Sequence, residues 1–147
     1  MMGTEAEILL VDDNPADLDL TCDALAQSEW LSHVSTVIDG EEAIAFLHRK
    51  GKYATAPRPH LVLLDLNLPR KDGRSVLADV KSDPVLRRIP VVIFSSSRAS
   101  PDIERCYELG ANSYVSKPAT LGEWISTVKL VKEYWIGCAC LPGEEEQ

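Results

Sequence analysis

The sequence predicts a single doubly wound α/β domain in which five parallel strands alternate with five helices on both faces of one sheet. Three observations support this prediction. The chain has 147 residues, which is enough for one sizeable core. Short aliphatic runs recur along it, and a segment with helical spacing of apolar residues follows each. The stretch from Leu61 to Pro69, LVLLDLNLP, begins with four consecutive aliphatic residues, which is typical of a strand buried on both faces of a parallel sheet.

The first strand and helix are the clearest pair in the sequence. Ala6–Val11 (AEILLV) is an apolar run and predicts the first strand. Asn14 can serve as an N-cap, with Pro15 at the first helical position. Asp17 lies in the first turn, where a carboxylate stabilises the helix dipole. We expect this helix to end near Ser28.

The other elements follow the same alternation. Strands are predicted where aliphatic or β-branched runs lie between turn residues, at His33–Ile38, from Leu61 to Asp65, at Ile89–Phe94 and at Ser113–Ser116. Helices are predicted from apolar spacing at Gly40–Lys50, Arg74–Ser82, Ser100–Leu109 (with Ser100 as cap and Pro101 in the first turn) and Leu121–Ile136. The segment Gly51–His60 between them reads as a turn-rich loop, either a docking surface or an ordinary solvent loop.

Polar side chains gather where the predicted strands end. The carboxyl ends of parallel strands share one edge of the sheet, and ligands bind at that edge. The sequence places Asp12, Asp13, Asp65, Ser95 and Lys117 there. Three carboxylates at one point repel one another, so a divalent cation and an ammonium group are expected beside them. Mg²⁺ fits best, because it binds one or two carboxylates, a carbonyl and waters.

Asp65 is the predicted nucleophile of this set, because it follows the central strand and a carboxylate can form an aspartyl phosphate. Lys117 and the Ser95 hydroxyl are placed to stabilise negative charge on a transferred phosphoryl group. Simpler interpretations remain for the single residues. Asp12 and Asp13 could be ordinary polar residues at a helix start, and Asp65 could cap the turn that follows it.

The joint pattern resembles the receiver domain of two-component response regulators over nearly the whole chain, from Ile8 to about Ile136. The matching motifs are VDDN, LLDLNLPRKDG, VVIFSSS and NSYVSKP. The resemblance implies a flavodoxin-like (βα)5 fold with strand order 2-1-3-4-5. It implies that residues 6–136 form the receiver, with tails at residues 1–5 and 137–147 and no output domain.

The resemblance also assigns roles to residues. It implies that Asp65 is the phosphoacceptor and that Asp12, Asp13, Asp65 and the backbone carbonyl of Asn67 hold Mg²⁺. It implies that Lys117, Ser95 and Ser96 contact the phosphoryl group, that Ser95 and Tyr114 form the conformational switch, and that the Lys117–Pro118 bond is cis. Two positions depart from the common family pattern: Ser96 stands where many receivers have alanine, and Ala119 where an aromatic residue is frequent.

More narrowly, the segments DDNPADLDLT, DGEEAIAFL and ELGANSYVSKP are similar to stand-alone receivers that are paired with bacterial and cyanobacterial phytochrome kinases. The expected partner is therefore a sensor histidine kinase of the phytochrome type. The expected activity is that of a phosphorylated signalling module and not of an enzyme. A degenerate receiver that binds partners without phosphorylation is the alternative.

Two other classes of protein share part of this pattern but need residues that this chain lacks. A haloacid-dehalogenase-like phosphohydrolase also uses an Asp after a buried strand, but it needs a second acid two residues later, where this chain has Asn67. A flavodoxin-like flavin binder needs a phosphate-binding loop rich in Ser, Thr or Gly after the first strand. This chain has the anion-repelling Asp12 and Asp13 at that point.

Composition narrows the choice of partners and location. The formal net charge is −8 and the basic residues are scattered, which argues against binding to nucleic acid or to an anionic membrane. No segment approaches the roughly 20 apolar residues of a membrane span, and the amino terminus is acidic, so a cytoplasmic location is expected. The four cysteines have no zinc-site spacing; Cys22 and Cys106 are expected to be packed thiols.

The last helix has more apolar positions than one sheet can cover. Leu121, Trp124, Ile125, Val128, Val131 and Trp135 form a stripe at helical spacing. Leu130, Tyr134 and Ile136 lie roughly opposite that stripe. We therefore expect a homodimer through this helix, with Leu130, Tyr134 and Trp135 in the interface; the alternative is a monomer with a few exposed apolar residues.

Overall fold

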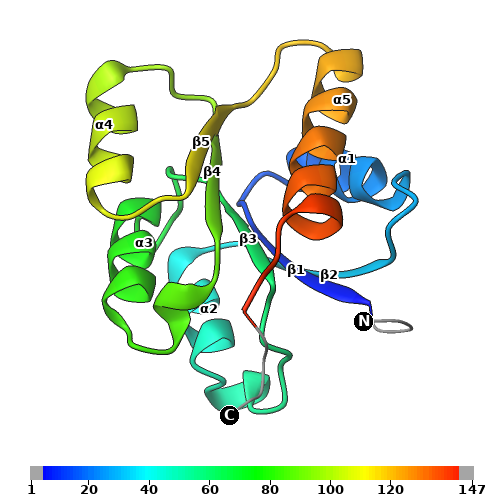
Figure 1. Cartoon of the computed structure of the whole chain (residues 1–147). Coiled ribbons are helices and arrows are strands. Elements are labelled where there is room, and N and C mark those ends of the chain that lie inside the picture. The colour runs from blue at the N-terminus through cyan, green and yellow to red at the C-terminus, as the bar shows by residue number, and fades with distance from the viewer. Residues whose placement is uncertain (1–4, 143–147) are drawn as a thin grey trace.

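The computed structural model describes residues 5–142 and contains a five-stranded sheet in the order β2-β1-β3-β4-β5 (Figure 1). The strands are β1 (Ala6–Val11), β2 (Ser32–Val37), β3 (Leu61–Leu64), β4 (Val91–Ser95) and β5 (Ser113–Ser116). All four neighbouring pairs are parallel. The predicted fold class and strand order are confirmed.

Helices cover both faces of the sheet, and each face has its own apolar core. The helices are α1 (Pro15–Ala26), α2 (Gly40–Leu47), α3 (Gly73–Ser82), α4 (Ser100–Glu108) and α5 (Leu121–Lys132). In Figure 1, α1 and α5 lie together on one side, and α2, α3 and α4 lie on the other. Alternate strand residues point to opposite faces, so Leu9 and Leu64 join one core while Ile8 and Leu63 join the other. Burial on both faces explains why these strands are continuously aliphatic.

Most helix starts follow the local chemistry of the sequence, with one exception. The Asn14 side chain accepts a hydrogen bond from the Asp17 N–H, as predicted for an N-cap. The prediction that Ser100 caps α4 is wrong. Ala99 holds the N-cap position without a side-chain bond, and Ser100 is already helical. The Ala99 N–H is instead satisfied by the Ser97 hydroxyl, at 3.3 Å.

Several predicted boundaries shift by a few residues. The helix expected over Gly40–Lys50 ends at Leu47, because the backbone turns into the left-handed region at Arg49 (φ 57°). The strand expected from Ile89 starts at Val91, because Ile89 closes a short 3₁₀ turn, Leu86–Arg88. The loop Gly51–His60 also contains a 3₁₀ turn, Gly51–Tyr53.

The last helix changes its winding part-way. α5 ends at Lys132 and continues as a π-helical segment, Glu133–Cys138. The wider turn displaces later residues from the positions that 100° per residue predicts. Ile136 was expected to face away from the sheet, but it is half-buried against the core. Leu121, expected on the buried stripe, is 62% exposed because it is the first residue of the helix.

The cysteines and the membrane prediction can be compared directly with the structure. Cys106 is fully buried and burial raises the pKa of its thiol; Cys22 is half-buried, and Cys138 and Cys140 are exposed. Within residues 5–142, no helix combines the length and apolarity that crossing a bilayer requires. Parts of the predicted tails, residues 1–4 and 143–147, lie outside the described range.

Candidate functional site

Three carboxylates meet at the carboxyl edge of the sheet. Asp12 and Asp13 follow β1, and Asp65 follows β3, which is hydrogen-bonded to β1. The Asp65 N–H donates to the Val11 carbonyl oxygen at 2.9 Å, so the strand register itself brings these ends together. One carboxylate oxygen from each of the three residues lies within 4.8 Å of the others. Asp12 and Asp65 are each only 8% exposed, while Asp13 is open to solvent.

A lysine ammonium lies inside this cluster. The Lys117 Nζ donates hydrogen bonds to Asp12 Oδ2 at 2.7 Å and to Asp65 Oδ2 at 3.0 Å. It also donates to Asp17 Oδ2, in the first turn of α1, at 2.9 Å. The Lys117 side chain is 8% exposed. The cation is thus shared by three carboxylates that come from separate parts of the chain.

Asp17 was assigned only a helix-dipole role from the sequence. The first turn of α1 starts at the same sheet edge as Asp12, and this proximity was the signal that could have placed Asp17 near the lysine. Its position adds to the local negative charge: the four carboxylates of Asp12, Asp13, Asp17 and Asp65 face one lysine ammonium, a formal excess of three negative charges.

The protonation states follow from these contacts. Burial raises the pKa of Asp12, opposed by hydrogen bonds from Lys117 and from the Asn14 N–H. Burial alone would lower the pKa of Lys117. Its hydrogen bonds to Asp12 and Asp17 and the charge of Asp65 outweigh that effect, so the pKa of Lys117 is raised and the ammonium stays charged.

The turn after β3 fixes the Asp65 side chain. Asp65 Oδ1 accepts a hydrogen bond from the Leu66 N–H at 2.7 Å, and Oδ2 accepts from Lys117. The Gly73 N–H donates to the Leu66 carbonyl at 2.8 Å, which closes the turn. A Cβ on Gly73 would lie 2.2 Å from the Asp65 carbonyl oxygen, so α3 can begin here only with glycine. The carboxylate orientation therefore depends on a close backbone approach.

The donor set fits a divalent cation. Hard oxygen ligands with a formal excess of negative charge are what Mg²⁺ and related ions bind. Asp13 is exposed to solvent, so a bound ion could keep part of its water shell, while Asp12 and Asp65 are buried beside it. Asn67 lies two residues beyond Asp65 and is exposed at the same edge.

The serine residues after β4 differ in their surroundings. Ser95 is fully buried, and its carbonyl accepts the Lys117 N–H at 2.8 Å, which continues the pairing of β4 with β5. The Ser95 hydroxyl accepts from the Ser97 N–H at 3.3 Å. Ser96, the next residue, is exposed. The predicted cis bond at Lys117–Pro118 is wrong: the bond is trans, the isomer that prolyl bonds ordinarily prefer.

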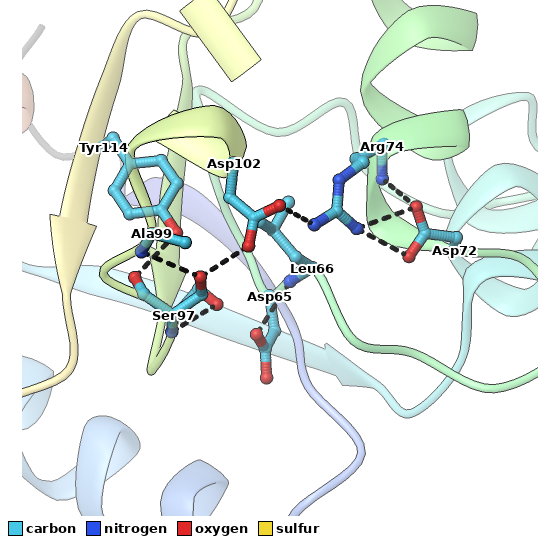
Figure 2. Close-up of polar contacts among 9 residues, drawn as sticks. Asp65, Leu66, Asp72, Arg74, Ser97, Ala99, Asp102 and Tyr114 are labelled. Atoms are coloured by element: carbon cyan, nitrogen blue, oxygen red, sulfur yellow. Dashed lines mark hydrogen bonds and ion pairs between the residues drawn. The ribbon is translucent and has the colours of Figure 1, made fainter. Parts of the chain in front are cut away.

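Tyr114 is anchored by a residue that the sequence did not single out. Figure 2 shows its hydroxyl pointing at Ser97, whose carbonyl oxygen accepts the hydrogen bond at 2.8 Å. The Tyr114 ring is half-buried against the core on the side of α2 to α4. Figure 2 also shows a chain of polar contacts from Ser97 through Asp102 to Arg74, on α4 and α3.

The predicted dimer residues lie on the outer part of α5 and beyond it. Leu130 and Tyr134 are 66% and 54% exposed, the latter in the π-helical segment. Trp135 is half-buried against the core, with its ring edge-to-face on Tyr134 at 5.1 Å between centroids. A shallow surface groove runs beside Leu130, lined by Gly122, Ile125, Ser126, Lys129 and Glu133.

Comparison with known proteins settles the family. The response regulator receiver domain matches residues 8–129. The chain belongs to this family. Response regulator Rcp1 of Synechocystis sp. is 42% identical to this receiver over 136 residues, which is 92% of each chain. The resemblance noted from the sequence motifs is thereby confirmed.

Solved structures give the same result. The phosphorylated cyanobacterial phytochrome response regulator RcpA is 50% identical, with a TM-score of 0.92 over 95% of this receiver and all of that chain. The Mn²⁺-bound form of Rcp1 is 41% identical, with a TM-score of 0.90 over 94% of this receiver and 99% of that chain. The receiver is therefore similar to single-domain response regulators along almost its full length.

Proposed function

We propose that this receiver accepts a phosphoryl group from a sensor histidine kinase on Asp65 and signals through a conformational change. One observation carries the proposal: the Lys117 ammonium is hydrogen-bonded to both Asp12 and Asp65, with Asp13 beside them. This arrangement leaves a carboxylate near a cation site and a fixed positive charge, which is what phosphoryl transfer to an acid requires.

The transfer uses groups on three segments of the chain. An Asp65 carboxylate oxygen attacks phosphorus in line with the leaving group. A new O–P bond forms while the N–P bond of the donor phosphohistidine breaks, and the electron pair of that bond returns to the imidazole. Lys117 and the Ser95 hydroxyl, with the exposed Ser96 at the rim, hydrogen-bond the phosphoryl oxygens as negative charge spreads over them. Because the acceptor is the receiver's own side chain, we infer a stoichiometric signalling protein and not an enzyme.

Mg²⁺ is the proposed cofactor. It would be held by Asp12, Asp13, Asp65 and the Asn67 carbonyl, and when bound it neutralises negative charge on the acceptor and the phosphoryl oxygens. The existence of an Mn²⁺-bound form of the relative Rcp1 supports the binding of a divalent cation.

A phytochrome-type histidine kinase is the proposed donor. The support is the 50% identity to a receiver described as a cyanobacterial phytochrome response regulator, together with the 42% identity to Rcp1. A bacteriophytochrome response regulator, RtBRR, is also similar, at 36% identity and a TM-score of 0.75. Switching through Ser95 and Tyr114 would then pass the light signal to a downstream partner.

We also propose that the receiver forms a homodimer through the outer part of α5. Leu130 and Tyr134 expose apolar surface one helical turn apart. Such a pair on one helix, beside a shallow groove, suits a self-complementary contact with a second copy. Trp135 supports Tyr134 from behind by ring packing.

The phosphoacceptor proposal is tested by incubation with acetyl phosphate and Mg²⁺, followed by intact mass spectrometry. We expect one added phosphoryl group on the wild type, stable when cold and labile in alkali, and none on Asp65→Asn. Labelling of Asp65→Asn would overturn the assignment of Asp65. An unlabelled wild type that still binds its kinase would favour the alternative, a receiver that works without phosphorylation.

A further inference from the structure

Ser97 is a junction between the predicted phosphoryl-binding serine and the predicted switch tyrosine. Its N–H donates to the Ser95 hydroxyl at 3.3 Å, and its carbonyl accepts from the Tyr114 hydroxyl at 2.8 Å. Its own hydroxyl donates to Asp102 Oδ2 at 2.5 Å. Three separate groups of one loop residue thus contact β4, β5 and α4 (Figure 2).

Asp102 is held from its other side by α3. The Arg74 guanidinium donates to Asp102 Oδ1 at 2.6 Å, so each carboxylate oxygen has its own partner. Arg74 also contacts Asp72, which caps the start of α3, at 3.2 Å. The Arg74 and Asp102 side chains are 29% and 30% exposed, which keeps them partly shielded from water.

The Arg74 and Asp102 side chains each stabilise the charged form of the other. The hydrogen bond from Ser97 and the Arg74 guanidinium lower the pKa of Asp102. The hydrogen bond to Asp102 raises the pKa of Arg74. The contact is thus a charge-assisted bridge between α3 and α4, the kind that is shorter and stronger than a neutral hydrogen bond.

We propose that Asp102, which is hydrogen-bonded to Arg74, is a positioning residue for the switch. It fixes the position of the Ser97 loop, so that the Ser97 carbonyl oxygen holds Tyr114 in its inward, half-buried conformation. Apart from Asp102, the one group in the described part of the chain that bonds the Ser97 hydroxyl is the Ala99 N–H, at 3.3 Å. Without the Asp102 contact the loop, and with it the acceptor for Tyr114, would be free to shift.

The consequence for signalling rests on the proposed function. If a phosphoryl group on Asp65 attracts the Ser95 hydroxyl, the space behind Ser95 favours the inward Tyr114. A contact that raises the population of inward Tyr114 therefore also strengthens phosphoryl binding, since coupling between two sites is reciprocal. Through the Arg74–Asp102 bridge, the positions of α3 and α4 would therefore affect how strongly the phosphoryl group is bound.

The first test needs no ligand. The receiver is labelled with 3-fluorotyrosine, and the Tyr114 resonance is identified by its absence in Tyr114→Phe. The variant Asp102→Asn keeps the shape of the side chain and removes its charge, and we expect Tyr114 to gain solvent exposure, seen as a larger H₂O/D₂O isotope shift. Glu104→Gln, which makes the same change at an exposed α4 position, should leave the resonance unchanged. An unchanged Tyr114 resonance in Asp102→Asn overturns the proposal.

The second test uses beryllofluoride with Mg²⁺ as a phosphoryl mimic. Its binding is measured from the change in the Tyr114 fluorine resonance during titration. We expect about fivefold weaker binding to Asp102→Asn than to Glu104→Gln. Ser97→Ala should weaken beryllofluoride binding similarly. The double variant should bind as tightly as Asp102→Asn alone, because both substitutions act on the same contact between Ser97 and Asp102. Equal affinities, or fully additive effects, overturn the coupling. Absence of binding to the wild type would instead refute the proposed function, while the ligand-free test would still decide the role of Asp102.

Discussion

The buried Lys132 ammonium of α5 donates a hydrogen bond of 2.8 Å to the backbone carbonyl oxygen of Leu25, in the last turn of α1. It donates a second bond, of 2.6 Å, to the Trp30 carbonyl. Lys132 is 1% exposed, and burial lowers the pKa of its ammonium. The Leu25 carbonyl lies in the last turn of α1, where carbonyls lack the usual partner four residues later, and Trp30 lies in the loop that follows α1. Lys132 bonds both carbonyls and so joins α5 to the end of α1.

Replacement of this lysine is therefore expected to destabilise the fold. Lys132→Met keeps the aliphatic volume but removes the ammonium donor from the Trp30 carbonyl, and leaves the Leu25 carbonyl with the longer bond from the Ser28 N–H, at 3.4 Å. We expect the free energy of unfolding in urea to fall by about 1–3 kcal/mol. Lys129→Met on the same helix is the control and should change it by less than about 0.5 kcal/mol. Equal stabilities of the two variants would contradict the role of Lys132.

The close approach of Gly73 to the Asp65 backbone is expected to affect both stability and phosphorylation. In Gly73→Ala, the new methyl group would lie 2.2 Å from the Asp65 carbonyl oxygen, so the turn that orients Asp65, the proposed acceptor, must open. We expect lower stability and slower labelling by acetyl phosphate. Gly122→Ala on α5 is the matched control, because its Cβ meets nothing within 4 Å. Alanine there should raise stability by about 0.5–1 kcal/mol. Normal labelling of Gly73→Ala would show that the close approach is not needed.

Lys117 is expected to act on the transfer step and not on cation binding. In Lys117→Ala the transferred phosphoryl oxygens lose a fixed charge, and the rate of labelling should fall by about 100-fold. The carboxylates that remain carry more net negative charge, so calorimetric titration should give unchanged or tighter Mg²⁺ binding. Loss of Mg²⁺ binding in Lys117→Ala would show that the lysine organises the site instead.

Tyr53 gives a prediction for the pH dependence of stability. Burial and the hydrogen bond to Glu42 raise the pKa of Tyr53 to about 12. Folding thus favours the neutral phenol. This contribution is complete below the unfolded-state pKa of about 10 and is lost as the pH rises through the folded-state value. The stability difference between wild type and Tyr53→Phe should be constant up to about pH 10 and shrink above it. A difference that stays constant to about pH 12 would contradict the raised pKa.

The proposed homodimer can be tested by light scattering after size exclusion on the full chain. The double variant Leu130→Lys with Tyr134→Glu should be a monomer, because it places charges on the exposed face of α5. Leu31→Lys with Val85→Glu is the control, since Leu31 and Val85 are 68% and 55% exposed elsewhere. It should remain a dimer like the wild type. A wild type of monomer mass would end the dimer proposal.

Local chemistry was sufficient for the sheet and the acid cluster. Continuous aliphatic runs predict strands that are buried on both faces, and parallel strands bring their carboxyl ends to one edge. Asp12, Asp65 and Lys117 could therefore be placed together without coordinates. The order of the strands and the roles of these residues came from the family resemblance, because periodicity alone does not distinguish between sheet orders.

The errors of the sequence interpretation lie where local patterns compete with contacts between distant segments. Serine is a common N-cap residue, so Ser100 was expected to cap α4, but the Ser97 hydroxyl accepts the hydrogen bond from the Ala99 N–H instead. Ile136 would face away from the sheet in a regular α-helix, but the π-helical segment rotates its side chain toward the core. Each outcome depends on which of two groups lies nearer in space, and sequence spacing does not contain that distance.

The sequence by itself determined the fold class, the edge that carries the site and the acids that form it, because these depend on local apolar runs and on which residues follow each strand. Only the tertiary structure decided that Asp17 shares Lys117, that Ser97 holds Tyr114 and that Lys132 closes α1. These contacts join residues up to 107 positions apart. Their energies depend on distances of about 3 Å, which only the packed chain defines.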